Sequence, residues 1–273
     1  MHGVRYSSRA GERLVAVYYN ENDSFASAWL SELIADGLIA EGEVDDRSII
    51  DVSAGDLAGY DQCHFFAGIG GWSHALRLAM WGDDRPVWTG SCPCQPLSSA
   101  GQRKGHDDER HLWPAFYALI AECRPATIFG EQVASKDGRE WLAGVRADLE
   151  GLGYAVGAAD LCAASVGAPH IRQRLWWVAD ASEDRRDVRQ NPGRKRSAHQ
   201  PEQQFGLRSK SGGSGARGFW QGEYISCADG KARLIEPGIF PLAHGVPNRV
   251  GTLRGAGNAI VPQVAAEFVR AVM

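Results

Sequence analysis

The chain has 273 residues, of which 44% are hydrophobic and 23% are charged, and its formal net charge at pH 7 is −4. This composition is ordinary for a globular protein, and the length suits one large α/β domain with or without a small appendage. No apolar run is long enough to span a bilayer, and the first fifteen residues lack the apolar core of a signal peptide. We therefore expect a cytoplasmic protein with no membrane association.

Strands and helices are predicted to alternate along the first 180 residues. Apolar and β-branched runs predict strands at 14–20, 48–52, 63–67, 86–90, 126–130, 154–162 and 175–179. Helical patterns cover about 24–37, 72–80, 111–123 and 137–152, and the first helix follows a capping residue, Asp23. This alternation favours an α/β fold built on a mostly parallel, doubly wound sheet.

The pattern changes after residue 180. Residues 180–230 are rich in Gly, Ser, Arg and Gln, which is typical of a linker or of an insertion that a partner orders. Nine Lys and Arg lie within 185–217, whereas residues 21–60 hold ten Asp and Glu against one Arg. The basic segment is either a polyanion-facing surface or a solvated loop. A final helix is expected over 261–273, with Pro262 in its first turn.

Six cysteines are scattered without CxxC pairs, which indicates reduced thiols and no disulfide framework. Two of them share the stretch WTGSCPCQPLS. Cys92 and Cys94 lack the second pair that a zinc site needs, so no metal is expected. Cys94 follows Pro93 at the end of a predicted strand, where parallel sheets place reactive groups. It is a candidate nucleophile, with a buried structural cysteine as the alternative.

Three further motifs contain candidate functional residues near the ends of predicted strands. The glycine turn in FFAGIGGWSHAL lets a backbone approach a ligand, although it lacks the GxGxxG spacing of a dinucleotide site. Glu131 in FGEQVAS ends a buried strand, where a carboxylate is costly unless it is paired or functional. Arg172 and Arg174 in GAPHIRQRLWWVAD share one strand face and suit an anion or a carboxylate.

Taken in order, these motifs and the terminal RGAGNAIVP resemble the C5-cytosine-specific DNA methyltransferase family, over roughly residues 15–265. The compact size resembles its phage and prophage members. The resemblance implies a Rossmann-like S-adenosylmethionine-dependent methyltransferase fold and a DNA (cytosine-5-)-methyltransferase. It also implies S-adenosyl-L-methionine as cofactor, double-stranded DNA as partner, a flipped-out target cytosine, and DNA methylation of the restriction-modification type. We expect a monomer.

The resemblance assigns four catalytic residues. Cys94 would add to C6 of cytosine, which makes C5 nucleophilic. Glu131 would hold N3 and the exocyclic amine and supply a proton, as a protonated glutamate in a dry pocket can. Arg174 would orient the cytosine and Arg172 would support the pocket. The chain departs from the family at two neighbours of these residues, Gln132 in place of Asn and His170 in place of Gln.

The resemblance also places cofactor-binding residues. Phe66, Gly68 and Gly70 match the family's first motif, in which His64 replaces a usual Asp; Pro93, Leu112 and Asn258 would line the same pocket. Only about 15 residues separate Gly71 from the next predicted strand, too few for the family's second and third motifs. Those motifs match upstream, with Glu21 as ribose ligand and Asp51 as adenine ligand, or else both are plain surface carboxylates.

The inferred motif order is therefore II, III, I, IV, VI, VIII. We expect residues 1–180 to form the catalytic and cofactor-binding domain. Residues 181–245 would form a small, irregular target-recognition region, and residues 246–273 would return to the catalytic domain. Two alternatives remain open, namely an RNA or tRNA cytosine C5-methyltransferase and a catalytically silent DNA-binding relative.

Overall fold

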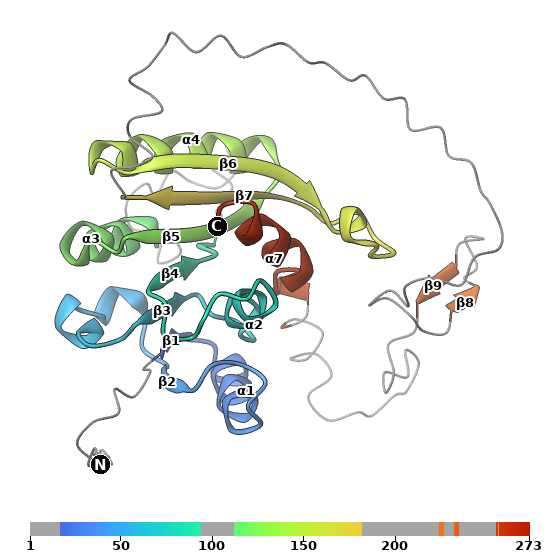
Figure 1. The fold of residues 1–273 in the computed structure, drawn as a ribbon, viewed down its shortest axis with the longest axis horizontal. Helices are drawn as coiled ribbons and strands as arrows, with labels where there is room; N and C mark the ends of the chain where they lie inside the picture. The colour runs from blue at the N-terminus through green and yellow to red at the C-terminus, as the bar shows by residue number, and fades with distance from the viewer. Residues whose placement is uncertain (1–16, 94–111, 182–223, 227–231, 235–254, 256) are drawn as a thin grey trace, which may run out of the picture.

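The computed structural model describes residues 17–93, 112–181, 224–226, 232–234, 255 and 257–273. A seven-stranded sheet with the order β2-β1-β3-β4-β5-β7-β6 forms its centre (Figure 1). The strands are β1 Val17–Asn20, β2 Gly42–Asp45, β3 Gln62–Phe65, β4 Val87–Gly90, β5 Thr127–Val133, β6 Ala155–Cys162 and β7 Gln173–Asp180. The pairs from β2 to β5 are parallel, and β7 runs antiparallel to both β5 and β6. The predicted mostly parallel α/β sheet is confirmed.

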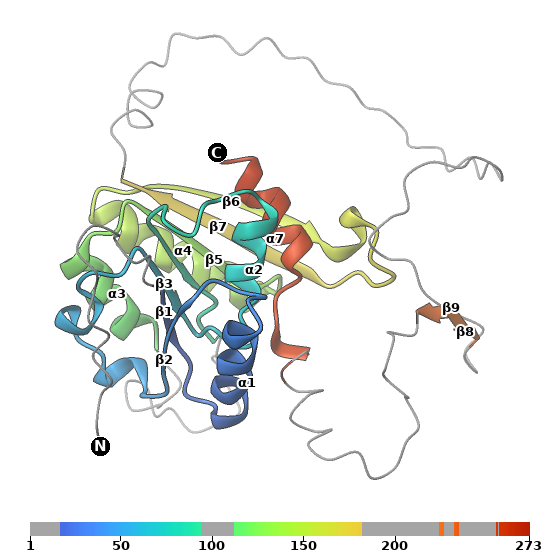
Figure 2. The ribbon, with the colours of Figure 1, turned by 60° about the horizontal axis from the view of Figure 1, so that its bottom comes forward.

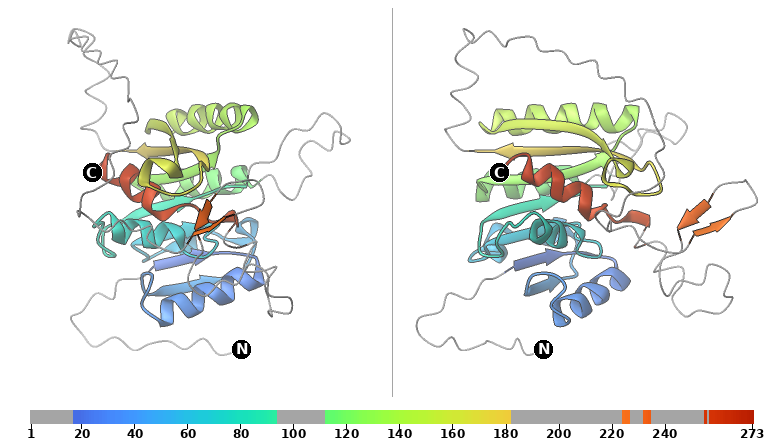
Figure 3. Two further views of the ribbon diagram at one scale, coloured as in Figure 1. Left: turned by 90° about the vertical axis from the view of Figure 1, so that its right-hand side faces the viewer. Right: turned by 45° about the vertical axis from the view of Figure 1, so that its right-hand side comes forward.

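Helices cover both faces of the sheet (Figure 2). The helices are α1 Ser24–Ala35, α2 Gly71–Leu78, α3 Trp113–Cys123, α4 Lys136–Gly151 and α7 Pro262–Arg270, with 3-10 turns η1 Ile49–Asp51, η2 Ala54–Leu57 and η3 Ala163–Val166. The first two helices and α7 pack on one face, while η1, η2, α3 and α4 pack on the other. In Figure 3, α2 and α7 lie side by side across the sheet from α3 and α4.

Alternation along β7 shows how one strand serves both faces. Trp176 is buried among α2 and α7 residues, whereas its neighbour Trp177 is buried against α3. Side chains of consecutive strand residues point to opposite faces, so each indole fills a separate core. Burial of a side chain this large stabilises the fold by a few kcal/mol, about 25 cal/mol for each Å² of apolar surface.

The structure corrects one predicted strand. Residues 48–52 are not extended; Ile49–Asp51 form the 3-10 turn η1, and Ser48 caps it by accepting from the amide of Ile50. The strand of this region is β2, which begins six residues earlier at Gly42. The predicted helix at 24–37 is confirmed as α1, whose amides at Phe25 and Ala26 donate to the Asp23 carboxylate.

The predicted C-terminal helix is confirmed as α7, with Pro262 as its first residue. Within the expected recognition region, the structure describes a pair of antiparallel strands, β8 Tyr224–Ser226 and β9 Ala232–Leu234; the rest of 182–245 lies outside the described residues. In the part of the chain that the structure describes, no helix has the length and apolarity needed to cross a membrane.

Candidate active site

The carboxyl ends of the parallel strands meet at one edge of the sheet. Glu21 follows β1, the glycine turn from Phe66 to Gly70 follows β3, and Ser91 follows β4. Strand β7 enters the sheet at this edge because it runs in the opposite direction, with Arg174 paired to Val133 of β5. In open α/β sheets this edge is where ligands bind.

The glycine turn has the left-handed backbone that its sequence predicts. Gly68 and Gly70 have φ values of +56° and +74°. A Cβ on Gly70 would lie 2.9 Å from a methyl carbon of Ile39, whereas one on Gly68 would meet no atom within 4 Å. Gly70 is thus needed for packing, while Gly68 borders open space in the described structure. Phe66, the first residue of this turn, has φ +52° and packs partly against the α3 side.

Glu21 contacts the glycine turn directly, although 47 residues separate them. Its Oε2 accepts a hydrogen bond of 2.7 Å from the amide of Gly68, and its Oε1 accepts one of 2.9 Å from the amide of Asp23. The half-buried carboxylate therefore joins the end of β1 to the turn after β3. This is the place where a ligand lying along the glycine turn would meet a carboxylate.

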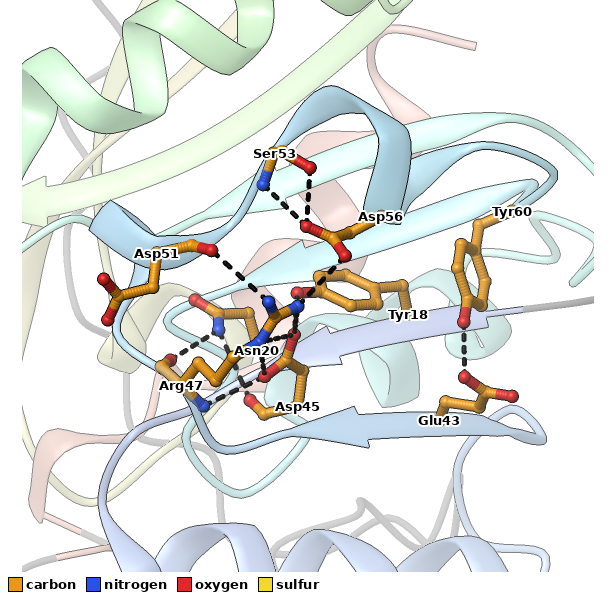
Figure 4. Close-up of polar contacts among 9 residues, drawn as sticks. All are labelled: Tyr18, Asn20, Glu43, Asp45, Arg47, Asp51, Ser53, Asp56 and Tyr60. Atoms are coloured by element: carbon orange, nitrogen blue, oxygen red, sulfur yellow. Dashed lines mark hydrogen bonds and ion pairs between the residues drawn. The ribbon is translucent and has the colours of Figure 1, made fainter. Parts of the chain in front are cut away.

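Asp51 occupies a different setting from the one predicted. It is exposed in η1, and its backbone carbonyl accepts from Arg47 (Figure 4). The acid at the end of the actual strand is Asp45, which accepts from Tyr18 at 2.7 Å and pairs with Arg47 at 2.6 Å. Burial alone would raise the pKa of the Asp45 carboxyl, but the hydrogen bonds from Arg47 and Tyr18 outweigh it and hold that pKa at about 2.

Arg47 acts as the centre of a polar network on this side of the sheet. It contacts Asp45, the backbone of Asp51 and, at 3.4 Å, the carboxylate of Asp56 in η2 (Figure 4). Asp56 in turn accepts from the amide and the hydroxyl of Ser53. These contacts connect the 3-10 turns η1 and η2 to β2. They also occupy the side chains of Asp45, Arg47 and Asp56, which a ligand would otherwise meet here.

Glu131 and Arg174 form a buried ion pair at the edge where β4 and β5 end. Arg174 Nε lies 2.8 Å from Glu131 Oε1, and the two side chains are 20% and 10% exposed. Burial raises the pKa of the Glu131 carboxyl, and Arg174, Arg172 and the Ser91 hydroxyl oppose that rise. The arrangement keeps a proton-binding carboxyl beside a fixed cation in a mostly dry setting.

Arg172 has a separate partner. Its Nη2 donates a 2.5 Å hydrogen bond to the carbonyl of Ala259, and its own backbone has φ +33°. Burial lowers the pKa of its guanidinium, as does the nearby Arg174. Arg172 thus connects the start of β7 to the C-terminal segment that precedes α7, and the exposed Asn258 is the residue before its acceptor.

Gln132 is a site residue that its sequence position alone did not reveal. It is 2% exposed, and its Nε2 donates to the carbonyl of Cys92 at 3.1 Å. This contact holds the backbone that leads to Pro93 and on to Cys94. The departure from the family's Asn to Gln beside Glu131 is the available signal, because an amide in a buried strand needs a partner.

The other predicted residues are placed as follows. Cys94 lies outside the described residues, and Pro93 is exposed as the last described residue before it. Leu112 precedes α3 and packs against the core on that side. Cys92 is 3% exposed and packs in the same core. Among the described residues no two cysteines form a disulfide, and no group of His, Cys, Asp and Glu could hold a metal.

Sheet order and strand directions define a Rossmann-like fold of the S-adenosylmethionine-dependent methyltransferase type, with its candidate site at the strand edge. The family model for C-5 cytosine-specific DNA methylase matches residues 83–214, which contain Cys94, Glu131, Arg172 and Arg174. The family model thus assigns this stretch, just under half of the chain, to that family.

Two curated relatives agree with that assignment. Type II methyltransferase M.AplI of Arthrospira platensis is 37% identical over 95 residues, 34% of this chain and 28% of the relative. Type II methyltransferase M.AgeI of Thalassovita gelatinovora is 34% identical over 104 residues, 37% of this chain and 24% of the relative. These matches thus span about a quarter of the relatives' length. Among solved structures, the S. pombe Dnmt2 methyltransferase matches with a TM-score of 0.38 and 18% identity, over 61% of this chain and 50% of that one.

Proposed function

We propose that this chain is a DNA (cytosine-5-)-methyltransferase that transfers a methyl group from S-adenosylmethionine to C5 of a flipped-out cytosine. The observation that carries the proposal is the buried Glu131–Arg174 pair at the strand edge. A carboxyl and a guanidinium fixed side by side match the N3 and O2 edge of cytosine, since the first can donate a proton and the second is always a donor.

The proposed chemistry divides among three residues. The Cys94 thiolate forms a bond to C6 while the Glu131 carboxyl gives its proton to N3, and the resulting enamine makes C5 nucleophilic. After C5 has been methylated, a base removes the C5 proton, the S–C6 bond breaks with departure of the thiolate, and N3 returns its proton to the Glu131 carboxylate. Arg174 orients the base throughout. The raised pKa of Glu131 suits this role because a proton is then available closer to neutral pH.

The residues of the glycine turn fit the cofactor. When bound, S-adenosylmethionine supplies an electrophilic methyl group. The open space at Gly68 and the half-buried Glu21 carboxylate beside it suit a ribose and the methionine part. We assign Phe66, Gly68, Gly70 and Glu21 to this pocket, with Pro93, Leu112 and Asn258 at its borders. Asp51 stays a proposed adenine ligand, on the strength of the family resemblance alone.

We assign recognition of a short double-stranded DNA sequence to residues 181–245, on the basis of their Arg, Lys, Gln, Ser and Gly content. A cytoplasmic monomer that acts in restriction-modification, or in protection of phage DNA, is the corresponding proposal for the whole protein. Both curated relatives are Type II methyltransferases.

Trapping on DNA that carries 5-fluorocytosine tests the function. This base cannot lose its C5 substituent, so the enzyme should stay bound through Cys94 as an adduct that survives denaturation. Cys94→Ala should form no adduct, and the matched control Cys92→Ala should still form it, because the Cys92 side chain lies in the core and its carbonyl, which accepts from Gln132, is kept. An adduct on tRNA and none on DNA would show that the substrate is RNA and not DNA. No adduct on either, with cofactor bound, would show a catalytically silent protein.

A further inference from the structure

Ser91 lies between the candidate acid and the helix that follows the glycine turn. It is the first residue after β4, and Glu131 is one residue beyond Gly130, the partner of Gly90 in the parallel pairing of β4 and β5. Equivalent residues on paired strands point to the same face, so the two side chains are neighbours on the α2 face. Trp176, the partner of Glu131 in β7, lies on that face too.

The other contact of Ser91 is Trp72 in the first turn of α2. The Trp72 indole Nε1 lies 3.1 Å from Ser91 Oγ. The ring itself is held firmly, since it is 3% exposed, stacks on Phe129 with centroids 6.1 Å apart and meets Trp176 edge-on at 5.6 Å. The direction of the Ser91 contact is therefore fixed by a rigid side chain.

Hydrogen-bonding capacity sets the direction of the chain of contacts. An indole N–H can only donate, an ionised carboxylate can only accept, and a hydroxyl has one proton and two lone pairs. Ser91 therefore accepts from Trp72 and has its single proton free for Glu131, toward which it acts as a donor. Arg174 contacts the same carboxylate through Oε1.

We propose that Ser91 is a positioning residue, which fixes the orientation and protonation of the Glu131 carboxyl and links it through Trp72 to α2. The proposal deepens the proposed function and rests on it as far as catalysis is concerned. No bond to the substrate is assigned to Ser91. Its effect passes through Glu131, whose ionised form it stabilises.

The consequence for the pH profile has a definite sign. Glu131 acts in its protonated form, so activity falls as the pH rises through its pKa. Removal of the Ser91 proton donor destabilises the anion and raises that pKa further. Ser91→Ala should therefore move the alkaline limb of the kcat profile to higher pH and lower its plateau about tenfold, since the carboxyl is less well oriented. Ser91→Thr keeps the hydroxyl and should restore both.

The matched control for the tryptophan is Trp81. Its indole donates to the carbonyl of Arg85 at 3.0 Å, on the same core but away from the carboxylate. Trp72→Phe should shift the profile in the same direction as Ser91→Ala, whereas Trp81→Phe should not shift it. A loss of rate at every pH without a shifted limb would assign Ser91 a merely structural role and overturn the proposal.

A second measurement does not depend on catalysis. In the nitrogen-15 spectrum of the free protein, the indole signal of Trp72, identified by its loss in Trp72→Phe, should move as Glu131 titrates. That movement should vanish in both Ser91→Ala and Glu131→Gln. A Trp72 signal that ignores Glu131 would refute the link, whatever the activity. A wild-type protein that shows the link but traps no 5-fluorocytosine would instead refute the proposed function and leave the contact established.

Discussion

His64 is a titratable side chain enclosed within the sheet. It is 1% exposed, its Nδ1 lies 2.7 Å from Thr89 Oγ1, and its ring centroid is 5.0 Å from that of Tyr19. Its Nε2 has no hydrogen-bond partner among the described residues. Burial lowers the pKa of this imidazole to about 3, so the ring is neutral in the folded protein near pH 7. The Asp that the family carries at this place would be charged, and His64 supplies a neutral partner to Thr89 instead.

Neutral burial of His64 predicts a loss of stability in acid. The unfolded chain takes up the proton near pH 6.5, the folded protein only near pH 3. The contribution of His64 is therefore complete above pH 6.5 and is lost as the pH falls, by about 1.4 kcal/mol per pH unit. Urea unfolding at pH 7 and pH 5 should show a loss about 2 kcal/mol larger in wild type than in His64→Gln.

The control for this measurement is His74→Gln, which removes a histidine of α2 that lies outside the Thr89 contact. It should keep the wild-type difference between the two pH values. Equal losses in wild type and His64→Gln would contradict the assignment of this acid sensitivity to His64.

At the scale of elements, apolar periodicity predicted most strands and helices but not β2. The sequence of this strand, GEVD, has one apolar residue, and its formation depends on its pairing with β1 at the sheet edge. The neighbouring Ile49-Ile50 has strong β propensity, yet Ser48 caps it as a 3-10 turn that buries only Ile49. Tertiary pairing and a local cap outweighed propensity in both places.

In the candidate site too, the sequence predicts some residues, whereas only the tertiary structure reveals others. Glu131, Arg172 and Arg174 could be predicted because a charge at the end of an apolar strand is conspicuous in one sequence. The contacts of Ser91 and Gln132 could not be, because they depend on the register of β4 against β5 and on the position of Trp72 in α2. Small polar residues near a strand end are common, and only the pairing shows which of them meets a carboxylate.

The contact between Glu21 and Gly68 connects two elements and predicts an effect on cofactor binding. Glu21→Ala should weaken binding of S-adenosylmethionine on the order of 10- to 100-fold, because it removes hydrogen bonds that involve a charged group. Calorimetry on the free protein measures this. Glu43→Ala is the matched control, since Glu43 bonds only to Tyr60 among the contacts described for it. Unchanged affinity in Glu21→Ala would contradict the ribose assignment, and Asp51→Ala in the same series tests the adenine assignment.

At the scale of the whole molecule, the order of the strands in the sheet differs from their order along the chain. The unit β1-α1-β2 comes first in the chain, yet β3, which carries the glycine turn, lies between β1 and β4. Parallel pairing of β1 with both neighbours brings the end of β1 beside that turn. This geometry supports the proposed motif order II, III, I, because a strand end needs only the right neighbour, and not a particular place in the chain, to contribute to the site.

The whole molecule also has a polarised charge, which predicts how DNA binding responds to salt. The chain has a net charge of −4, yet residues 185–217 hold nine Lys and Arg. If this segment contacts phosphates, counterions are released on binding, and the logarithm of the association constant falls with the logarithm of the salt concentration by about 0.9 for each contact. Replacement of Arg194, Lys195 and Arg196 by Ala should reduce that slope by up to about 3.

A surface arginine outside the basic segment provides the comparison. Arg146 lies on α4 and pairs with Glu150 four residues later, so Arg146→Ala should leave the slope unchanged. Fluorescence anisotropy with a short duplex at several salt concentrations gives the slopes directly. If the triple variant kept the wild-type slope, the basic segment would not contact DNA phosphates, and recognition would have to come from another surface. A reduced slope with unchanged 5-fluorocytosine trapping at low salt would place these cations in DNA association and outside the chemical step.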